Sequence, residues 1–163
     1  MIAVDTVHSW YRIETPAGPL NPEPGDAYGR LAMDARLIIA AAHVPLTDGA
    51  TTPGSAALID EGGIWLNGAP PESGDGFAWP SRVGSEPWWT NRAGQRWWDA
   101  CDTRGCPYDT VVRALLIRTG VHYGASIRVM SSQLWDAPGW APARRLVVAV
   151  FGPDADRSPL EPT

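Results

Sequence analysis

Alternation of apolar and polar residues marks the first element of the chain. Between residues 7 and 14, Val7 and the following odd-numbered residues share one face, while His8 and the following even-numbered residues share the other. This two-residue period is typical of a β-strand. The pattern predicts a strand over 7–14 with His8 on its polar face.

Three later segments repeat apolar residues at the spacing of an α-helix. The first follows Asp26, which we expect to cap it, and runs to His43. The second begins at Pro107, a residue suited to the first helical position, and ends at Gly124. The third covers 140–151. The stripes expected to be buried in the first two helices are Leu31, Ala35, Ile38, Ile39 and Ala42, and Val111, Val112, Leu115, Leu116 and Thr119.

Short apolar runs bounded by glycine and proline predict further strands. Segments 56–60 and 64–68 flank a Gly-Gly pair and are typical of a β-hairpin. Segments 77–80 and 126–132 predict two more strands. Segment 81–106 is rich in tryptophan and shows no regular period, so we expect it to be irregular.

With the short segment 77–80 set aside, these elements follow one another in the order β-α-β-β-α-β, with an additional C-terminal helix. This is the order of a split βαβ (ferredoxin-like) sandwich, in which helices cover one face of a sheet. The sequence therefore predicts the α+β class, with a single domain over 1–152. The proline-containing segment 153–163 is expected to be a flexible C-terminal tail.

Composition and charge narrow the classes of function. The chain has 163 residues and a net charge of −5, and all 13 of its basic residues are arginine. Without lysine it lacks a Schiff-base lysine and a Walker lysine. Its acidic balance argues against a nucleic-acid partner. Because the sequence shows neither a signal peptide nor a membrane-spanning run, we expect a cytoplasmic protein with no membrane partner.

The two cysteines do not form a recognisable metal motif. Cys101 and Cys106 lie five residues apart, whereas structural zinc sites use four ligands, usually from closely spaced pairs. The three histidines show no metal-binding spacing, and we expect His122 to be partly buried and hydrogen-bonded. The sequence predicts no metal and no cofactor. Cys106 is either a packed structural thiol or a nucleophile whose pKa the nearby helix start lowers.

A dense polar cluster over 102–109 precedes the second long helix. In a functional interpretation, Arg104 binds a small anionic ligand, the helix N–H groups assist it, and Tyr108 stacks on it. In a structural interpretation, Thr103 or Asp102 caps the helix and Arg104 pairs with Asp109. Residue types alone leave both open.

Nine tryptophans are an unusual number for this length. Adjacent side chains diverge, so at least one ring of each neighbouring pair should be partly exposed. Exposed rings beside arginines would suit a stacking pocket or a partner interface, although the same rings could pin a loop to the sheet. With the helix entrance, the candidate binding residues are Trp88, Trp89, Arg92, Arg96, Trp97, Trp98, Arg104, Tyr108 and Asp109.

Two blocks of the sequence carry a recognisable pattern. The first contains Trp65-Leu66-Asn67-Gly68 and then Phe77, Trp79 and Pro80; the second contains Cys101, Thr103, Pro107, Tyr108 and Asp109. The pattern resembles a family of small uncharacterised proteins of actinobacteria and their bacteriophages. The chain departs from it at Asp102, where the family has lysine, and at 131–133, where the family has Ser-Asp-Gly. The resemblance implies an origin rather than an activity.

The sequence favours a binding protein over an enzyme. Our first hypothesis is a phage accessory protein that engages a host protein or a small anionic metabolite in the host cytoplasm, with an anti-defence role as one form. The alternatives are a small enzyme that uses Cys106 and Asp109 at the helix entrance, and a virion or assembly component. The sequence leaves a homo-oligomer open.

Overall fold

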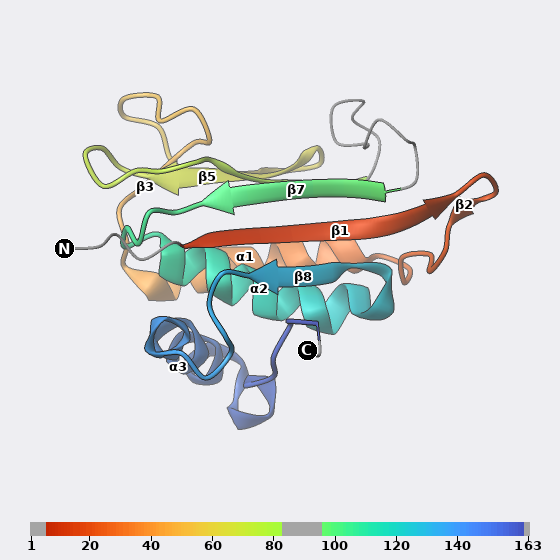
Figure 1. Cartoon of the computed structure of the whole chain (residues 1–163). Coiled ribbons are helices and arrows are strands. Elements are labelled where there is room, and N and C mark those ends of the chain that lie inside the picture. The colour runs from red at the N-terminus through yellow and green to blue at the C-terminus, as the bar shows by residue number, and fades with distance from the viewer. Residues whose placement is uncertain (1–5, 83–95, 162–163) are drawn as a thin grey trace.

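In the part of the chain that the structure describes, antiparallel sheets combine with three α-helices, which confirms the predicted α+β class (Figure 1). The computed structural model describes residues 6–82 and 96–161, and only the backbone of residues 96 and 97. The helices are α1 (Ala27–Ala42), α2 (Asp109–Tyr123) and α3 (Ala141–Phe151). The strands are β1 (Val7–Thr15), β2 (Gly18–Pro19), β3 (Leu46–Thr47), β4 (Leu58–Asp60), β5 (Gly63–Gly68), β6 (Phe77–Pro80), β7 (Arg96–Asp102) and β8 (Arg128–Ser131).

The first sheet is built around β1. Strands β7 and β8 pair with its two sides, both antiparallel, so that Tyr11 lies opposite Trp98 and His8 lies opposite Ser131. Because α2 connects β7 to β8, these elements form one split βαβ unit with β1 between its two strands. Strand β2 pairs, antiparallel, with the C-terminal end of β1.

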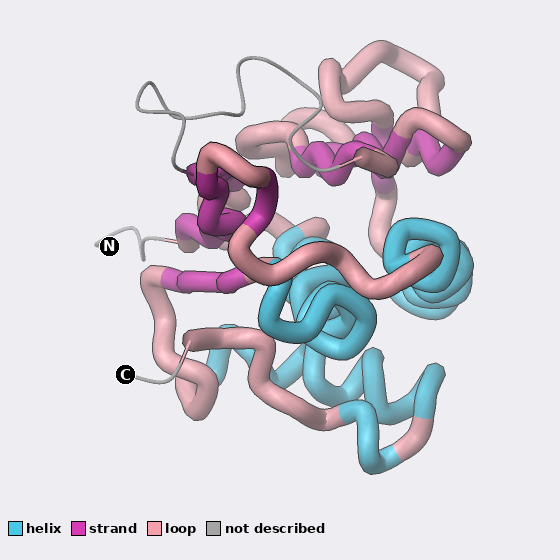
Figure 2. Tube along the Cα trace, turned by 90° about the vertical axis from the view of Figure 1, so that its right-hand side faces the viewer, coloured by secondary structure: helices cyan, strands magenta, loops and turns pink. Residues whose placement is uncertain are grey.

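The second sheet is built around β5, which pairs with β3, β4 and β6. The predicted hairpin and the predicted strand over 77–80 are confirmed here as β4, β5 and β6. The strands that directly follow α1 therefore pair with one another rather than with β1. The complete ferredoxin-like topology is not confirmed, and Figure 2 shows the strands in two groups above the helices.

Helix α2 lies in the centre of the molecule, with α3 on the side away from the sheets (Figure 1). Ten of its residues are buried, among them Val112, Leu115 and Leu116. An aromatic cluster joins it to both sheets, because Trp79 of β6 packs against Trp10 of β1 and donates a hydrogen bond of 3.0 Å to Tyr123. Among residues 6–82 and 96–161, no helix is both long enough and apolar enough to cross a bilayer.

Helices α1 and α2 are also joined by a polar contact, which we name the Asp34 cluster. Asp34 Oδ2 accepts hydrogen bonds from Arg118 Nε at 2.7 Å and from His122 Nε2 at 2.6 Å. The Arg118 guanidinium stacks on Phe151 of α3 at 4.1 Å. The expected role of His122, partly buried and hydrogen-bonded, is confirmed.

The structure differs from the sequence predictions in three local features of the backbone. Residues 96–102 form strand β7 rather than an irregular segment. His8 is completely buried, because the face of β1 that carries His8 and Trp10 turns toward α2. Asp26 does stand before α1, yet its side chain makes no capping hydrogen bond, since its backbone is left-handed with φ 56°.

The C-terminal segment folds back against the first sheet instead of forming the expected flexible tail. Residues Pro153–Ala155 form a short 3₁₀ turn, and Leu160 forms a parallel bridge with Val129 of β8. The backbone N–H of Glu161 donates to the carbonyl of Val129 at 3.0 Å, and Tyr11 donates to the Glu161 carboxylate at 2.6 Å.

Candidate functional site

Asp109, the first residue of α2, is the centre of a buried polar group that we name the Asp109 cluster. Its Oδ1 accepts a hydrogen bond from Thr103 at 2.6 Å and lies 2.8 Å from His8 Nε2. Its Oδ2 accepts a hydrogen bond of 2.5 Å from Arg113 Nε. The carboxylate is therefore held from three directions by β1, the turn before α2, and α2 itself.

The cluster forms because its members come from elements whose geometry the fold fixes. Asp109 and Arg113 are four residues apart and so share one face of α2. The Arg113 guanidinium also lies over the ring of Trp140 at 4.9 Å, and the side chain is only 1% exposed. An aromatic face and a carboxylate together compensate a guanidinium that has left water.

The surroundings of Asp109 lower the pKa of its carboxyl group below the ordinary value. Burial on its own would raise this pKa, but the hydrogen bonds from His8 and Thr103 and the charge of Arg113 outweigh burial. Asp109 is therefore ionised at neutral pH.

His8 connects the cluster to the first sheet. Its Nδ1 lies 3.0 Å from Ser131 Oγ on β8, while its Nε2 faces Asp109. In the neutral ring with the proton on Nε2, Nδ1 accepts from the serine hydroxyl and Nε2–H donates to the carboxylate. In this arrangement His8 can accept a proton from Ser131 while the ionised Asp109 stabilises the charged ring, and the same contacts tie β8 to α2.

A hollow of about 680 Å³ opens beside this cluster at the start of α2, and we name it the helix-mouth pocket. Its volume is within the range of small-molecule sites. Most of its wall is apolar, and its polar groups come mainly from α2 and from the segment after β8, with Thr6 from directly before β1. The lining residues are Thr6, Gly105, Cys106, Pro107, Asp109, Thr110, Arg113, Gln133, Ala137, Pro138, Gly139 and Pro142.

Arg113 contributes a hydrogen-bond donor that the described part of the chain does not use. Its Nε bonds to Asp109 and its Nη2 donates to Gln133 Oε1 at 3.0 Å, but its buried Nη1 has no partner among the described residues. A Cβ atom on Gly139 would lie 3.0 Å from this Nη1 and 2.2 Å from Gln133 Oε1. Glycine at 139 therefore lets the wall of the pocket approach the guanidinium closely.

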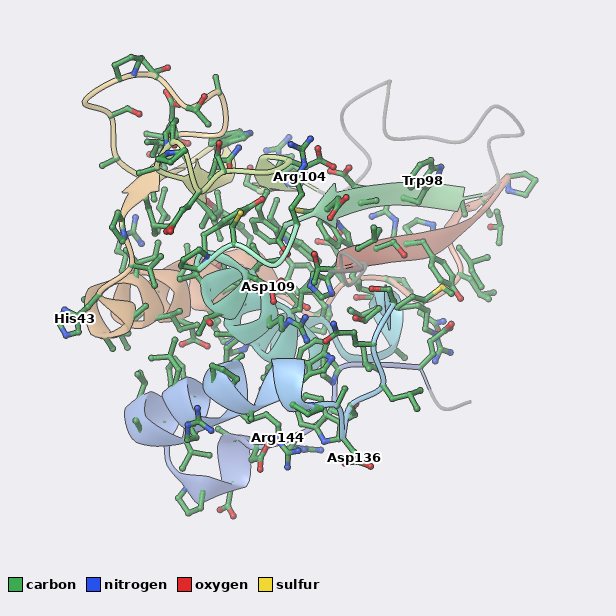
Figure 3. The ribbon with its side chains drawn as sticks, turned by 60° about the vertical axis from the view of Figure 1, so that its left-hand side comes forward. His43, Trp98, Arg104, Asp109, Asp136 and Arg144 are labelled. Atoms are coloured by element: carbon green, nitrogen blue, oxygen red, sulfur yellow. The ribbon has the colours of Figure 1, made fainter. Side chains whose placement is uncertain are left out.

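The arginine at the helix entrance is Arg113, not Arg104 as the sequence analysis expected. Arg104 is exposed on the preceding loop, and Asp109 pairs with Arg113 and His8 instead (Figure 3). The Arg104 backbone has φ 56°, and its N–H donates to Asp102 Oδ1 at 2.9 Å. Arg104 contributes to the turn rather than to the pocket.

Tyr108 and the helix N–H groups are also committed to the fold. Tyr108 is buried, and its hydroxyl donates to the carbonyl of Asp75 at 2.7 Å, so it does not offer a ring to the pocket. The N–H groups of Asp109 and Thr110 donate to the carbonyls of Cys106 and Pro107. An anion in the pocket would therefore depend on side chains rather than on the backbone of the first turn.

Both cysteines are free thiols in different environments. Cys101 is buried, and burial together with the nearby Asp75 charge raises the pKa of its thiol to about 12. Cys106 is half-buried and lines the helix-mouth pocket. Of the two, only Cys106 can meet a molecule in the pocket.

The predicted tryptophan and arginine surface is described only in part. Trp88, Trp89 and Arg92 lie outside the described residues, and Arg96 and Trp97 are described by backbone only, as part of β7. Trp98 is 49% exposed and, with Tyr11 opposite it, lies on the outer face of the first sheet (Figure 3). It does not line the pocket.

Sequence reasoning missed His8, Ser131, Gln133 and Arg113 as parts of one site. The first three come from strands or loops that only the tertiary fold brings to α2. Arg113 left a signal, because a charged residue one turn after Asp109 interrupts a run of helical residues that are otherwise apolar.

Comparison with known proteins adds no assignment: no family model matches the chain, and neither does a curated protein or a solved structure. Within 6–82 and 96–161, no three His, Cys, Asp or Glu side chains are grouped so that they could hold a metal ion. The chemistry of the site therefore depends on the Asp109 cluster and the pocket beside it.

Proposed function

We propose that the protein binds a small anionic molecule in the helix-mouth pocket. The observation that carries this proposal is the Arg113 guanidinium, which is 1% exposed and lines the pocket with Nη1 free of partners among the described residues. A buried donor without a partner costs free energy, about 1–3 kcal/mol, and a ligand oxygen at this position would recover it. The free donor thus supports the pocket as a binding site.

The proposal is tested by thermal unfolding of the protein against a collection of small anions, with two double variants as the comparison. Arg113→Met with Asp109→Asn removes both charges beside the pocket, whereas Arg118→Met with Asp34→Asn removes the same pair in the Asp34 cluster. At least one anion should raise the Tm of the wild type and of the Asp34-cluster variant, but not of the Asp109-cluster variant. Equal shifts in all three proteins, or none in any, would overturn the proposal.

An enzyme is the second candidate, favoured by the hydrogen-bonded series Ser131, His8 and Asp109, of which Asp109 lines the pocket. In this function, His8 accepts the Ser131 proton and Asp109 stabilises the charged ring, as in acyl transfer. A fluorophosphonate probe should then label Ser131 in the wild type and not after His8→Gln. If Ser131 of the folded wild type is not labelled, the enzymatic function is excluded and binding remains as the proposed function.

The resemblance to proteins of actinobacteria and their phages suggests the biological setting of this binding activity. We propose that the protein acts in the host cytoplasm as a phage accessory protein, with the bound anion as a host metabolite. The exposed outer face of the first sheet, with Trp98 and Met130, is the surface available for a host protein. Expression of the gene early in infection, with the protein absent from purified virions, would support this role over a virion component.

A further inference from the structure

The polar groups of the helix-mouth pocket specify the charge of its ligand. We infer that the pocket takes a monocarboxylate with an apolar body, an inference that rests on the proposed function. The Asp109 carboxylate forms an ion pair with the same guanidinium that would bind the ligand. It offsets most of the arginine charge, so little attraction remains to compensate the desolvation of the ligand. This cost rises with the square of the charge and is therefore far larger for a phosphate dianion than for a monocarboxylate.

The number of free donors points the same way. Arg113 has used two of its three nitrogens on Asp109 and Gln133, which leaves one side of the guanidinium for one ligand oxygen. The side-chain nitrogen of Gln133 and the hydroxyl of Thr110 make no hydrogen bond within the described segments. Only one of these donors is charged, which matches the single charge of a carboxylate better than the double charge of a phosphate.

The rest of the pocket fits an apolar group. Carbon-rich side chains of Pro107, Pro138 and Pro142 lie around it, with Ala137 and the Cys106 thiol. Such walls bind by removing apolar surface from water and offer nothing to a second charge. A ligand with its carboxylate at Arg113 would therefore place its apolar body near Cys106.

Cys106 supplies a readout for the test, and Cys101 supplies its internal control. The probes are 4-phenylbutyrate, octanoate and indole-3-acetate, the primary amide of each, and phenyl phosphate. Calorimetry gives the affinities, and the rate of iodoacetamide labelling at Cys106 reports occupation of the pocket. Labelling of Cys101, which is buried, would reveal unfolding instead.

At least one carboxylate should bind about tenfold or more tightly than its amide, a difference of about 1.4 kcal/mol, and should slow labelling of Cys106. Phenyl phosphate should bind more weakly than that carboxylate. The preference should vanish in the Arg113→Met, Asp109→Asn protein, provided that Cys101 stays unlabelled, and should persist in Arg118→Met, Asp34→Asn.

The outcomes separate the two proposals. If amides or phenyl phosphate protect Cys106 as well as the carboxylates do, the pocket binds small molecules but the assigned ligand class is wrong. If no probe binds or protects Cys106 at millimolar concentration while the anion collection raises the Tm, the class is again wrong and the pocket stands. If neither experiment gives a signal, the proposed function fails as well.

Discussion

Helix α2 carries two clusters with the same three residue types, and they differ in what surrounds them. In the Asp109 cluster, Asp109 binds Arg113 and faces His8; in the Asp34 cluster, Asp34 binds Arg118 and His122. Each arginine stacks on an aromatic ring next to or within α3.

The difference lies in burial and in the neighbouring space. His8 and Arg113 are at most 1% exposed, whereas Arg118 and His122 keep 11–12% of their side chains in contact with solvent. Water can therefore satisfy the remaining donors of Arg118, while Arg113 has a free donor beside an apolar hollow. The same set of residues is thus partly exposed in one place and more deeply buried beside a pocket in the other, where we propose that it binds a ligand.

Replacing the arginine of each cluster should give the largest difference in stability between the two clusters. Arg113→Met removes a guanidinium that is 1% exposed and leaves Asp109 without its buried cation, and should lower the free energy of unfolding by about 3–5 kcal/mol. Arg118→Met removes a guanidinium that water already reaches, and should cost about 1 kcal/mol. Urea denaturation measures both, and equal losses would remove the distinction between the clusters.

The Asp109 cluster should also make stability depend on pH. The pKa of Asp109 is lowered in the folded protein, so its contribution is present above the carboxyl pKa of the unfolded chain and is lost as the pH falls through the lower folded value. Asp109→Asn lacks this contribution at every pH. The stability gap between wild type and Asp109→Asn should therefore narrow below about pH 5 in denaturation at a series of pH values. A gap that widens on acidification would contradict the charge assignment.

Gly139→Ala should affect the Asp109 cluster and its pocket but not the Asp34 cluster. The new Cβ would lie 2.2 Å from Gln133 Oε1, so the amide must move and its bond with Arg113 is lost. We expect a loss of about 1–2 kcal/mol and weaker ligand binding. Gly25→Ala is a matched control, because nothing lies within 4 Å of its added Cβ. Calorimetry should show unchanged binding for the control, and unchanged binding for both variants would place the ligand elsewhere.

The smallest effect is a difference in the reactivity of the two thiols. Cys106 at the pocket should react with iodoacetamide in the folded protein, whereas Cys101, with its pKa raised to about 12 by burial, should react only on unfolding. Peptide mass spectrometry of briefly labelled protein measures both. Labelling of Cys101 first would show that strand β7 opens more readily than its contacts indicate.

The elements of this fold were largely predictable, because their apolar periods are local. Strand β7 was not, since alternation along it places Asp99 on the inner face and Trp98 on the outer one, so polarity does not follow burial. The division into two sheets depends on pairing between distant segments, for which no local signal exists.

The site was predictable in position but not in its members. The helix entrance near Asp109 was identified from the density of polar residues, yet the arginine that matters is one turn inside the helix. His8 was assigned to a solvent-facing side, because its partners Asp109 and Ser131 are 101 and 123 residues away along the chain. A buried polar residue can be recognised only when its partners are known.

Leu160 and Glu161, near the C-terminus, cover the outer edge of strand β8. Leu160 and Glu161 occupy backbone groups of Val129 that would otherwise face solvent as an open strand edge, and such edges pair readily with other chains. A version shortened before Leu160 would expose this edge while keeping Pro159, which lies against Gly120 of α2, and every residue that lines the helix-mouth pocket. Self-association of such a truncated protein, with Cys101 still protected from labelling, would therefore indicate pairing through the uncovered strand.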